Sequence, residues 1–219
     1  MSRSPVFTIG NFRIGRLTAI LIGLSILVAL VTSLGQDRLA CLPFYITVFG
    51  GRPGGPWFPE IMHGEVWRLV TPIFLHLGIM HIAFNMMCLK DLGTAIEQVL
   101  SARYLLALVL VIGALSNLAQ FAFAGPNFGG MSGVIYGLLG FIWMKAKFDP
   151  APRFRMPQEI LLWMLGWFVI CVLGIMPRVA NYAHGAGLLA GIIWGYISAR
   201  RTPRKKIYAD VEIIAPPRR

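Results

Sequence analysis

Long stretches without a charged side chain dominate the pattern of polar and apolar positions along this chain. Five such stretches, of 20, 21, 41, 18 and 21 residues, lie between the charged positions 16 and 37, 68 and 90, 103 and 145, 159 and 178, and 178 and 200. The longest is interrupted by the turn-forming run Gly-Pro-Asn-Phe-Gly-Gly at 125–130. A helix crosses the hydrocarbon core of a bilayer with about 20 apolar residues. We therefore predict six membrane-spanning helices, at residues 16–36, 74–95, 103–124, 130–146, 158–177 and 180–199.

These helices predict an all-α fold, a polytopic membrane bundle that forms one domain over residues 16–199. The other segments are a cytoplasmic N-terminal segment at 1–15, an outer loop at 37–73 and a basic cytoplasmic tail at 200–219. The outer loop is rich in glycine, proline and aromatic residues, which is typical of a structured loop at the membrane interface. Composition supports a membrane protein, because 13% of the residues are charged, whereas about a quarter are charged in soluble domains.

The basic residues predict how the bundle is oriented. With the N-terminus inside, 15 Lys and Arg residues fall on the cytoplasmic side, four fall in outer loops, and Lys90 lies within the second span. This asymmetry agrees with the positive-inside rule and predicts that both termini are cytoplasmic. We therefore attribute the net charge of +11 to topology and to contact with the lipid bilayer. We expect no nucleic-acid partner, because the basic residues are dispersed among loops rather than gathered on one face.

Polar residues on three of the predicted spans lie at one depth. The second, fourth and sixth spans all run from outside to inside, with Ser132 near the start of the fourth and His184 near the start of the sixth. The second span carries His81 and Asn85 four residues apart, on one helical face. Polar groups at membrane depth are costly and therefore functional candidates. Serine with histidine is the minimum pair for nucleophilic acyl transfer, so we predict a serine protease that works within a membrane.

Small residues predict close helix contacts beside this pair. Gly130 and Gly133 flank Ser132 and permit close backbone approach or unusual dihedral angles. Residues of this kind recur along the fourth span at Gly133, Gly137 and Gly140, and along the sixth span at Ala183, Gly187, Gly191 and Gly195. Such stripes let two helices approach closely in lipid, although they are common in any membrane bundle.

Each of these residues has a simpler interpretation. A serine at a helix start is most often an N-cap, and a histidine in a span can be structural or part of a proton relay. A transporter or channel that uses His76, His81 and His184 is a second possibility, although the spans contain almost no carboxylates. For the first span, the alternative is a cleaved signal peptide, but the uncharged stretch exceeds the usual 7–15 residues.

We expect no metal and no cofactor. A zinc-dependent intramembrane protease needs a His-Glu-x-x-His motif, which the sequence lacks. The three cysteines, Cys41, Cys88 and Cys171, are scattered and have neither metal-ligand spacing nor the pattern of a disulfide framework.

A set of short motifs follows in order along residues 60–200. They are Glu65-Val66-Trp67-Arg68 with Thr71-Pro72, His76, His81-x-x-x-Asn85, Gly93-x-x-x-Glu97, Gly130-Met131-Ser132-Gly133-x-x-Tyr136 and Ala183-His184-x-x-Gly187-x-x-x-Gly191. In these motifs the chain resembles the rhomboid family of intramembrane serine proteases. Its six spans are similar to the basic bacterial form of that family, which implies a bacterial plasma (inner) membrane protein.

The resemblance also implies a role for each site residue. Ser132 would be the nucleophile and His184 the general base, while Tyr136 would pack against the His184 ring and orient it. His81, Asn85 and the Ser132 backbone N–H would form the oxyanion hole. The partners would be transmembrane protein substrates that enter between the second and fifth spans and are cleaved near the outer leaflet. A catalytically inactive relative that binds membrane clients is the alternative, and the presence of both Ser132 and His184 argues against it.

Overall fold

Six long helices form the molecule in the computed structural model, which describes residues 7–8, 13–50, 57–176 and 179–202. They are α1 (Arg16–Val31), α4 (Ile79–Val99), α5 (Ala102–Ala124), α6 (Ser132–Phe148), α7 (Gln158–Val172) and α8 (Asn181–Arg200). Each overlaps one predicted span, and the order along the chain is the predicted one. Among the described helices, α5 alone is long and apolar enough to cross a bilayer, while α1 and α7 are apolar but shorter. The tail predicted to be basic and cytoplasmic lies, from residue 203 on, outside the described residues.

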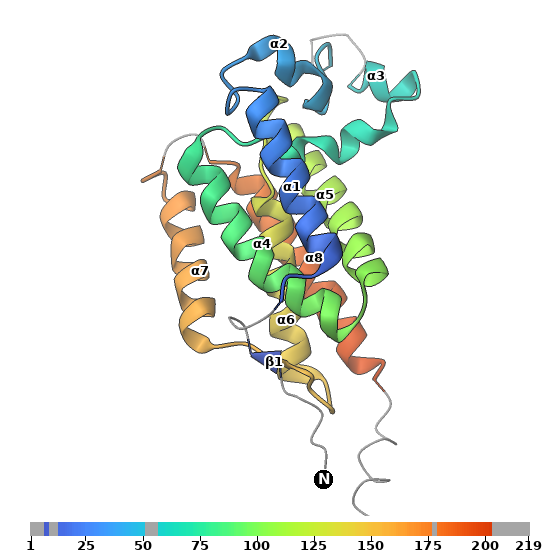
Figure 1. The fold of residues 1–219 in the computed structure, drawn as a ribbon, viewed down its shortest axis with the longest axis vertical. Helices are drawn as coiled ribbons and strands as arrows, with labels where there is room; N and C mark the ends of the chain where they lie inside the picture. The colour runs from blue at the N-terminus through green and yellow to red at the C-terminus, as the bar shows by residue number, and fades with distance from the viewer. Residues whose placement is uncertain (1–6, 9–12, 51–56, 177–178, 203–219) are drawn as a thin grey trace, which may run out of the picture.

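Helix α6 lies at the centre of the bundle (Figure 1). It packs most extensively against α8 and also contacts α5 and α4, while α1 packs against α4. Of its 17 residues, 12 are buried, which is why its sequence is apolar on all sides. In contrast, α7 stands at one edge of the bundle (Figure 1), and only Met164 and Cys171 are buried on it in the described part of the chain.

Several helices begin or end where residues with positive φ angles interrupt the apolar stretch. Helix α1 ends at Val31, not near 36, because Ser33, Leu34 and Gly35 follow with positive φ angles. Helix α4 begins at Ile79 rather than 74, directly after Gly78, whose φ is +128°. Helix α7 ends at Val172 rather than 177, and Gly174 follows with a φ of +75°. Apolar stretches therefore marked the helices but not their ends, which depend on local dihedral angles.

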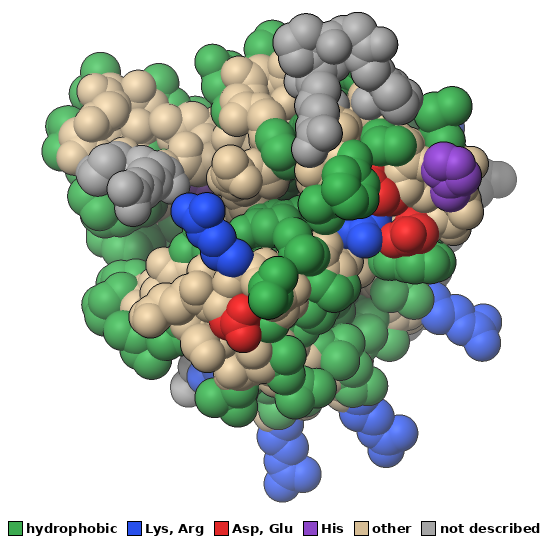
Figure 2. All heavy atoms as spheres, turned by 90° about the horizontal axis from the view of Figure 1, so that it is seen from above, with side chains coloured by type: hydrophobic (Ala, Val, Ile, Leu, Met, Phe, Trp, Pro, Cys, Tyr) green, Lys and Arg blue, Asp and Glu red, His purple; other side chains and the backbone are tan. Residues whose placement is uncertain are grey.

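Short helices and a small strand pair complete the described structure. They are α2 (Arg38–Cys41), η1 (Leu42–Phe44), α3 (Pro59–Met62), η2 (Val66–Leu69), η3 (Thr71–Phe74), β1 (Phe7–Thr8) and β2 (Phe154–Arg155). The helices belong to the predicted outer loop, whose described residues, 37–50 and 57–73, are thus structured. Seen from the end that they cover, charged side chains are scattered among hydrophobic ones (Figure 2). The strands pair in parallel at the opposite end of the bundle and were not predicted.

A buried arginine and a buried glutamate hold the outer loop in place. The Arg68 guanidinium donates to the backbone carbonyls of Leu42 and Tyr45, at 2.8 and 2.9 Å. The Glu60 carboxylate accepts hydrogen bonds from the Thr47 hydroxyl (2.6 Å) and from the Val48 and Phe49 amides (2.6 and 3.0 Å). Segments of the loop that are distant in sequence are therefore joined by charge-assisted hydrogen bonds.

The Glu60 contacts predict acid sensitivity of this part of the loop. Burial opposes ionisation of Glu60, but the hydrogen bonds from Thr47 and from two amides outweigh it and lower the pKa of the carboxyl group. A carboxyl group whose pKa is lower in the folded state than in the unfolded state stabilises the fold at pH values above its ordinary pKa. This stabilisation is lost as the pH falls through the pKa of the folded state. We expect the Val48 amide to be protected from hydrogen exchange at neutral pH and to lose that protection below pH 4.5. In Glu60→Gln, the Val48 amide should already exchange rapidly at neutral pH. If its protection in this variant matched that of wild type, the account would be contradicted.

A second carboxylate fastens the first helix to the bundle. The Glu97 side chain on α4 accepts hydrogen bonds from the Leu17 and Thr18 amides, both at 2.9 Å, and from the Thr18 hydroxyl at 2.8 Å. These amides belong to the first turn of α1, which has no partner for them within the helix. Gly93 lies one turn earlier on α4, and a Cβ atom there would approach the Thr18 side chain to 3.1 Å. The Gly93-x-x-x-Glu97 motif thus holds the start of α1.

Candidate active site

Ser132 and His184 are in direct contact. The Ser132 Oγ atom lies 2.7 Å from His184 Nε2, although the two residues are 52 positions apart. When Nε2 carries no proton, the serine hydroxyl donates this hydrogen bond. Ser132 is the first residue of α6 and Met131 occupies the N-cap position. Ser132 is therefore not the N-cap of α6, which was the simpler interpretation, and its side chain contacts His184 instead.

Glycine allows α6 and α8 to come this close. A Cβ atom on Gly187 would lie 2.0 Å from the Gly133 carbonyl oxygen, and one on Gly191 would lie 1.9 Å from the Gly137 carbonyl oxygen. Carbon atoms do not approach backbone oxygen to such distances, so the two helices touch backbone to backbone. The short Ser132 side chain and the His184 ring can meet only across an interface of this kind.

The His184 ring is held by packing. The Tyr136 ring lies against it with 4.8 Å between ring centroids, and the Phe168 centroid lies 6.3 Å away. The Tyr136 hydroxyl donates to the Met164 carbonyl at 3.0 Å, which ties this side chain to α7. His184 is 5% exposed, and its Nδ1 atom has no hydrogen-bond partner among the described residues. Aromatic contacts, rather than a hydrogen bond to Nδ1, therefore hold the ring within the described structure.

His81 lies beside the turn that precedes Ser132. A Cβ atom on Gly130 would lie 2.7 Å from His81 Nε2 and 3.8 Å from Ser132 Oγ, so both polar groups border this glycine. Gly130 also has a φ of +125°, a region that other residues rarely adopt. Gly130 therefore permits the close approach predicted for it, because a Cβ atom would collide with His81 and because other residues rarely adopt its φ angle.

Asn85 is buried one turn after His81 and contacts its own helix. Its amide nitrogen donates to the His81 carbonyl at 2.8 Å, while its Oδ1 atom has no partner in the described structure. An amide nitrogen carries two hydrogens, so one remains for a further acceptor. The structure thus gathers Ser132, His184 and His81 around Gly130, with Asn85 bonded to the backbone of α4.

His76 does not lie on α4, where the sequence interpretation placed it. It precedes Gly78, at which the backbone turns before the helix starts. The side chain is fully buried, with Nδ1 3.0 Å from the Phe74 carbonyl oxygen and its ring centroid 5.2 Å from that of His81. His76 therefore supports His81 from the loop side.

Two polar residues of α5 were not singled out from the sequence. The Gln120 side-chain oxygen accepts a hydrogen bond from the Ala183 amide at 3.1 Å, in the first turn of α8. Ser116 lies one turn earlier, against Gly133 and Gly187. Their spacing of four residues within an apolar helix was the available signal.

Metal-ligating side chains do not gather at this site. Within the described residues, no three His, Cys, Asp or Glu side chains are placed to hold a metal ion. The expectation of a metal-free and cofactor-free site stays a prediction.

The fold and site define a class: an all-helical bundle in which a serine at the start of one helix meets a histidine on another. A family model described as "Rhomboid domain" matches residues 63–201, and the chain belongs to the rhomboid family. The chain is 34% identical over 166 residues to a protein of Salmonella paratyphi A named "Rhomboid protease GlpG", and 35% identical to those of Salmonella typhi and Salmonella newport. Each match covers 73% of this chain and 60% of the relative, so the chain spans less than two thirds of those proteins.

Proposed function

We propose that this chain is an intramembrane serine endopeptidase that cleaves transmembrane segments of other membrane proteins near the outer leaflet. The observation that carries the proposal is the 2.7 Å contact between Ser132 Oγ and His184 Nε2. Support comes from membership of the rhomboid family and from relatives whose printed name is rhomboid protease.

In the proposed reaction the two residues act as a dyad. His184 Nε2 takes the hydroxyl proton while Ser132 Oγ attacks the scissile carbonyl carbon, and the bond to the leaving nitrogen then breaks. The protonated imidazole gives its proton to the departing amine, which leaves an acyl-enzyme on Ser132. Water, activated by the same imidazole, hydrolyses that ester. Tyr136 packs against the ring and keeps Nε2 directed at the serine.

The oxyanion that forms in each step needs hydrogen-bond donors. The Ser132 amide lies at the N-terminus of α6, where backbone N–H groups are free and the helix dipole is positive. The His81 ring borders Gly130 next to Ser132, and Asn85 has a second amide hydrogen available. These three groups form the proposed oxyanion hole, with Gly130, Gly133 and Gly187 providing the close approach.

For the membrane arrangement, we assign the six long helices as six spans with both termini in the cytoplasm. The protein would lie in the plasma membrane of a bacterium, with one domain at 16–199 between a short N-terminal segment and a basic tail. The bias of basic residues toward one side supports this orientation. The site would then open near the outer surface, where water reaches it.

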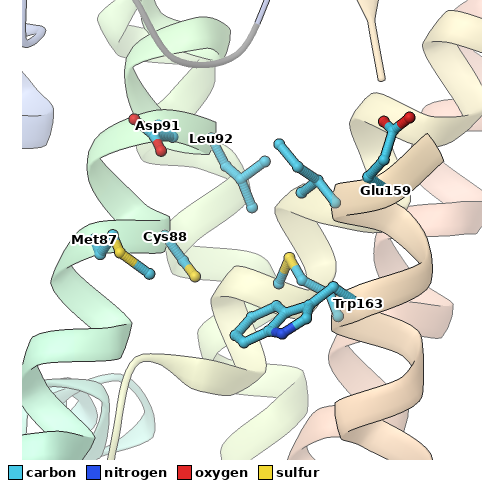
Figure 3. Close-up of a pocket in the computed structure, with 8 residues that line it drawn as sticks. Met87, Cys88, Asp91, Leu92, Glu159 and Trp163 are labelled. Atoms are coloured by element: carbon cyan, nitrogen blue, oxygen red, sulfur yellow. The ribbon is translucent and has the colours of Figure 1, made fainter. Parts of the chain in front are cut away.

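Transmembrane substrates would enter from the side of the bundle, between α4 and α7. A groove of about 390 Å³ lies there, and we call it the α4–α7 groove (Figure 3). It is lined by Met87, Cys88, Asp91, Leu92, Glu159, Ile160, Trp163 and Met164. Helix α7 contributes little to the core, so it is the helix that can move aside for a substrate.

The oxyanion assignment predicts a graded loss in Asn85→Ala. Removing one oxyanion donor typically lowers kcat by about 10²–10³-fold. Because the Ser132 amide and His81 remain, we expect the variant to lose activity by at most this factor and to remain measurable in a reconstituted cleavage assay. The matched control is Asn117→Ala, which removes a buried amide on α5 that donates to the Leu69 carbonyl of η2. A wild-type kcat in Asn85→Ala would show that Asn85 is not an oxyanion donor.

The proposal is tested most directly by labelling with a fluorophosphonate. This reagent modifies serine only when a base has activated the hydroxyl. We expect purified protein to be labelled at Ser132, and we expect His184→Ala to lose the label although Ser132 is still present. If wild-type protein is not labelled and does not cleave a transmembrane substrate, a client-binding function is favoured instead.

A further inference from the structure

Two carboxylates lie at one end of the α4–α7 groove. Asp91 is on α4 and Glu159 is in the first turn of α7, and Figure 3 shows both at the same end, with Cys88 and Trp163 further along. Lys90 Nζ lies 3.9 Å from Asp91, with side chains 54% and 32% exposed, and offsets the charge of one of the two carboxylates. Glu159 has no ion pair or hydrogen bond within the described part of the chain. Together with Lys90, the two carboxylates leave this end of the groove with a net negative charge.

The rest of the groove is apolar and open to the side. Its walls are formed mainly by Leu92, Ile160 and Met164, together with Met87 and Trp163. The last two side chains are 51% and 53% exposed, so the groove is accessible from outside the bundle. A groove of this kind suits the apolar face of another helix. Within lipid, a helix that packs here would also meet the two carboxylates.

Charge complementarity identifies which helix fits. The carboxylates lie at the end of the bundle that we assign to the cytoplasm, and transmembrane helices carry Lys and Arg on their cytoplasmic flank. We propose that the α4–α7 groove binds a substrate helix with a Lys or Arg near its cytoplasmic end, and that Asp91 and Glu159 pair with this cation. The proposal rests on the proposed function and names the substrate class: transmembrane segments with a basic inner flank.

The position of the cation follows from the geometry of α4. His81 borders the nucleophile and Asp91 lies ten residues further along the same helix, which corresponds to about 15 Å. A helical substrate covers that distance in roughly ten residues. The long Lys and Arg stems extend the reach of the charge beyond the helix. The basic residue therefore lies about ten or a few more residues to the cytoplasmic side of the scissile bond.

The test uses reconstituted protein and two substrates that differ only at this inner flank, with Lys-Lys or Gln-Gln. Wild-type protein should cleave the basic substrate with a kcat/KM roughly fivefold higher, mainly through KM, as one partly exposed ion pair would give. Asp91→Asn combined with Glu159→Gln should bring the ratio to about one. Asp91→Lys combined with Glu159→Lys should instead favour a substrate with a Glu-Glu flank.

The matched control is Asp37→Asn. It removes one negative charge at the opposite end of the bundle, and asparagine caps a helix as well as aspartate does. The control should show the wild-type ratio. Equal cleavage of both substrates by wild-type protein, or an unchanged ratio in the double variant, would overturn this inference and leave the proposed function in place. That is also the result expected if the groove holds a lipid chain. Absence of both cleavage and fluorophosphonate labelling would overturn the two together.

A second measurement is independent of turnover. In a Ser132→Ala protein with its native cysteines replaced by alanine, Ile160→Cys, which keeps both carboxylates of the groove, should form a disulfide, with a mild oxidant present, to a cysteine at the inner flank of the substrate. Gly23→Cys, on α1, should not, because α1 packs against α4 away from the groove. Equal crosslinking at both positions would contradict a bound substrate in the groove.

Discussion

We expect Ser132→Ala to abolish cleavage of a transmembrane substrate while the protein still folds and inserts. The change removes one oxygen atom at the start of α6, and with it the nucleophile whose Oγ lies 2.7 Å from His184. Loss of a serine nucleophile lowers kcat by about 10⁶-fold, whereas loss of one hydrogen bond changes the unfolding free energy by only about 1 kcal/mol. Cleavage should be measured in proteoliposomes and unfolding in detergent.

His184→Ala provides the second half of this test. Without a base the serine hydroxyl is a weak nucleophile at neutral pH, so we expect the same complete loss. A metal chelator should leave the wild-type rate unchanged, because no step uses a metal. Ser132→Ala protein that cleaved at the wild-type rate, in a preparation free of other proteases, would rule out the serine mechanism.

The second large effect is expected from Gly191→Ala. A Cβ atom here would lie 1.9 Å from the Gly137 carbonyl oxygen, so a single methyl group forces α6 and α8 apart. Overpacking of this kind costs about 1–3 kcal/mol or more. The loss of activity should exceed what the fraction of unfolded protein explains, because a displacement of about 1 Å at the reacting groups lowers the rate by about 10²-fold. Thermal unfolding and cleavage should be measured on the same preparation.

Gly23→Ala is the matched control for this variant. Gly23 is also within a helix, but a Cβ atom there would meet nothing within 4 Å. Alanine favours helix over glycine by roughly 0.5–1 kcal/mol, so this variant should be as stable as wild type or slightly more stable. Equal losses in the two variants would show that glycine contributes through helix propensity rather than through the contact of α6 with α8.

The sequence predicted the helices and the central pair because each leaves a strong local signal. Uncharged stretches gave six helices in the right order, and the rhomboid resemblance is shown by the family match. Equal depth on parallel-running spans was enough to expect Ser132 near His184. Local backbone conformation left a weaker signal, so the turn at Gly78 and the place of His76 before α4 were not expected.

Contacts between distant segments were beyond the sequence reasoning. Glu97 holds the first turn of α1 from 79 to 80 positions away. Lys145 is one of the 15 basic residues that the sequence placed on the cytoplasmic side, yet it is buried and forms an ion pair with Asp149. A carboxylate or ammonium group within a sequence does not reveal which backbone or side chain will neutralise it, because that depends on how the helices pack.

The contact between α6 and α8 has a consequence for how this interface can vary. Where side chains fill the space between helices, a larger residue on one helix is often accommodated by a smaller one on the other. At Gly187 and Gly191 the opposing atoms are main-chain carbonyl groups of Gly133 and Gly137. Every amino acid carries that carbonyl, so no substitution on α6 can make room for one on α8. These two α8 positions therefore have no compensatory partner, and a library that randomises both helices together should still return glycine at each of them.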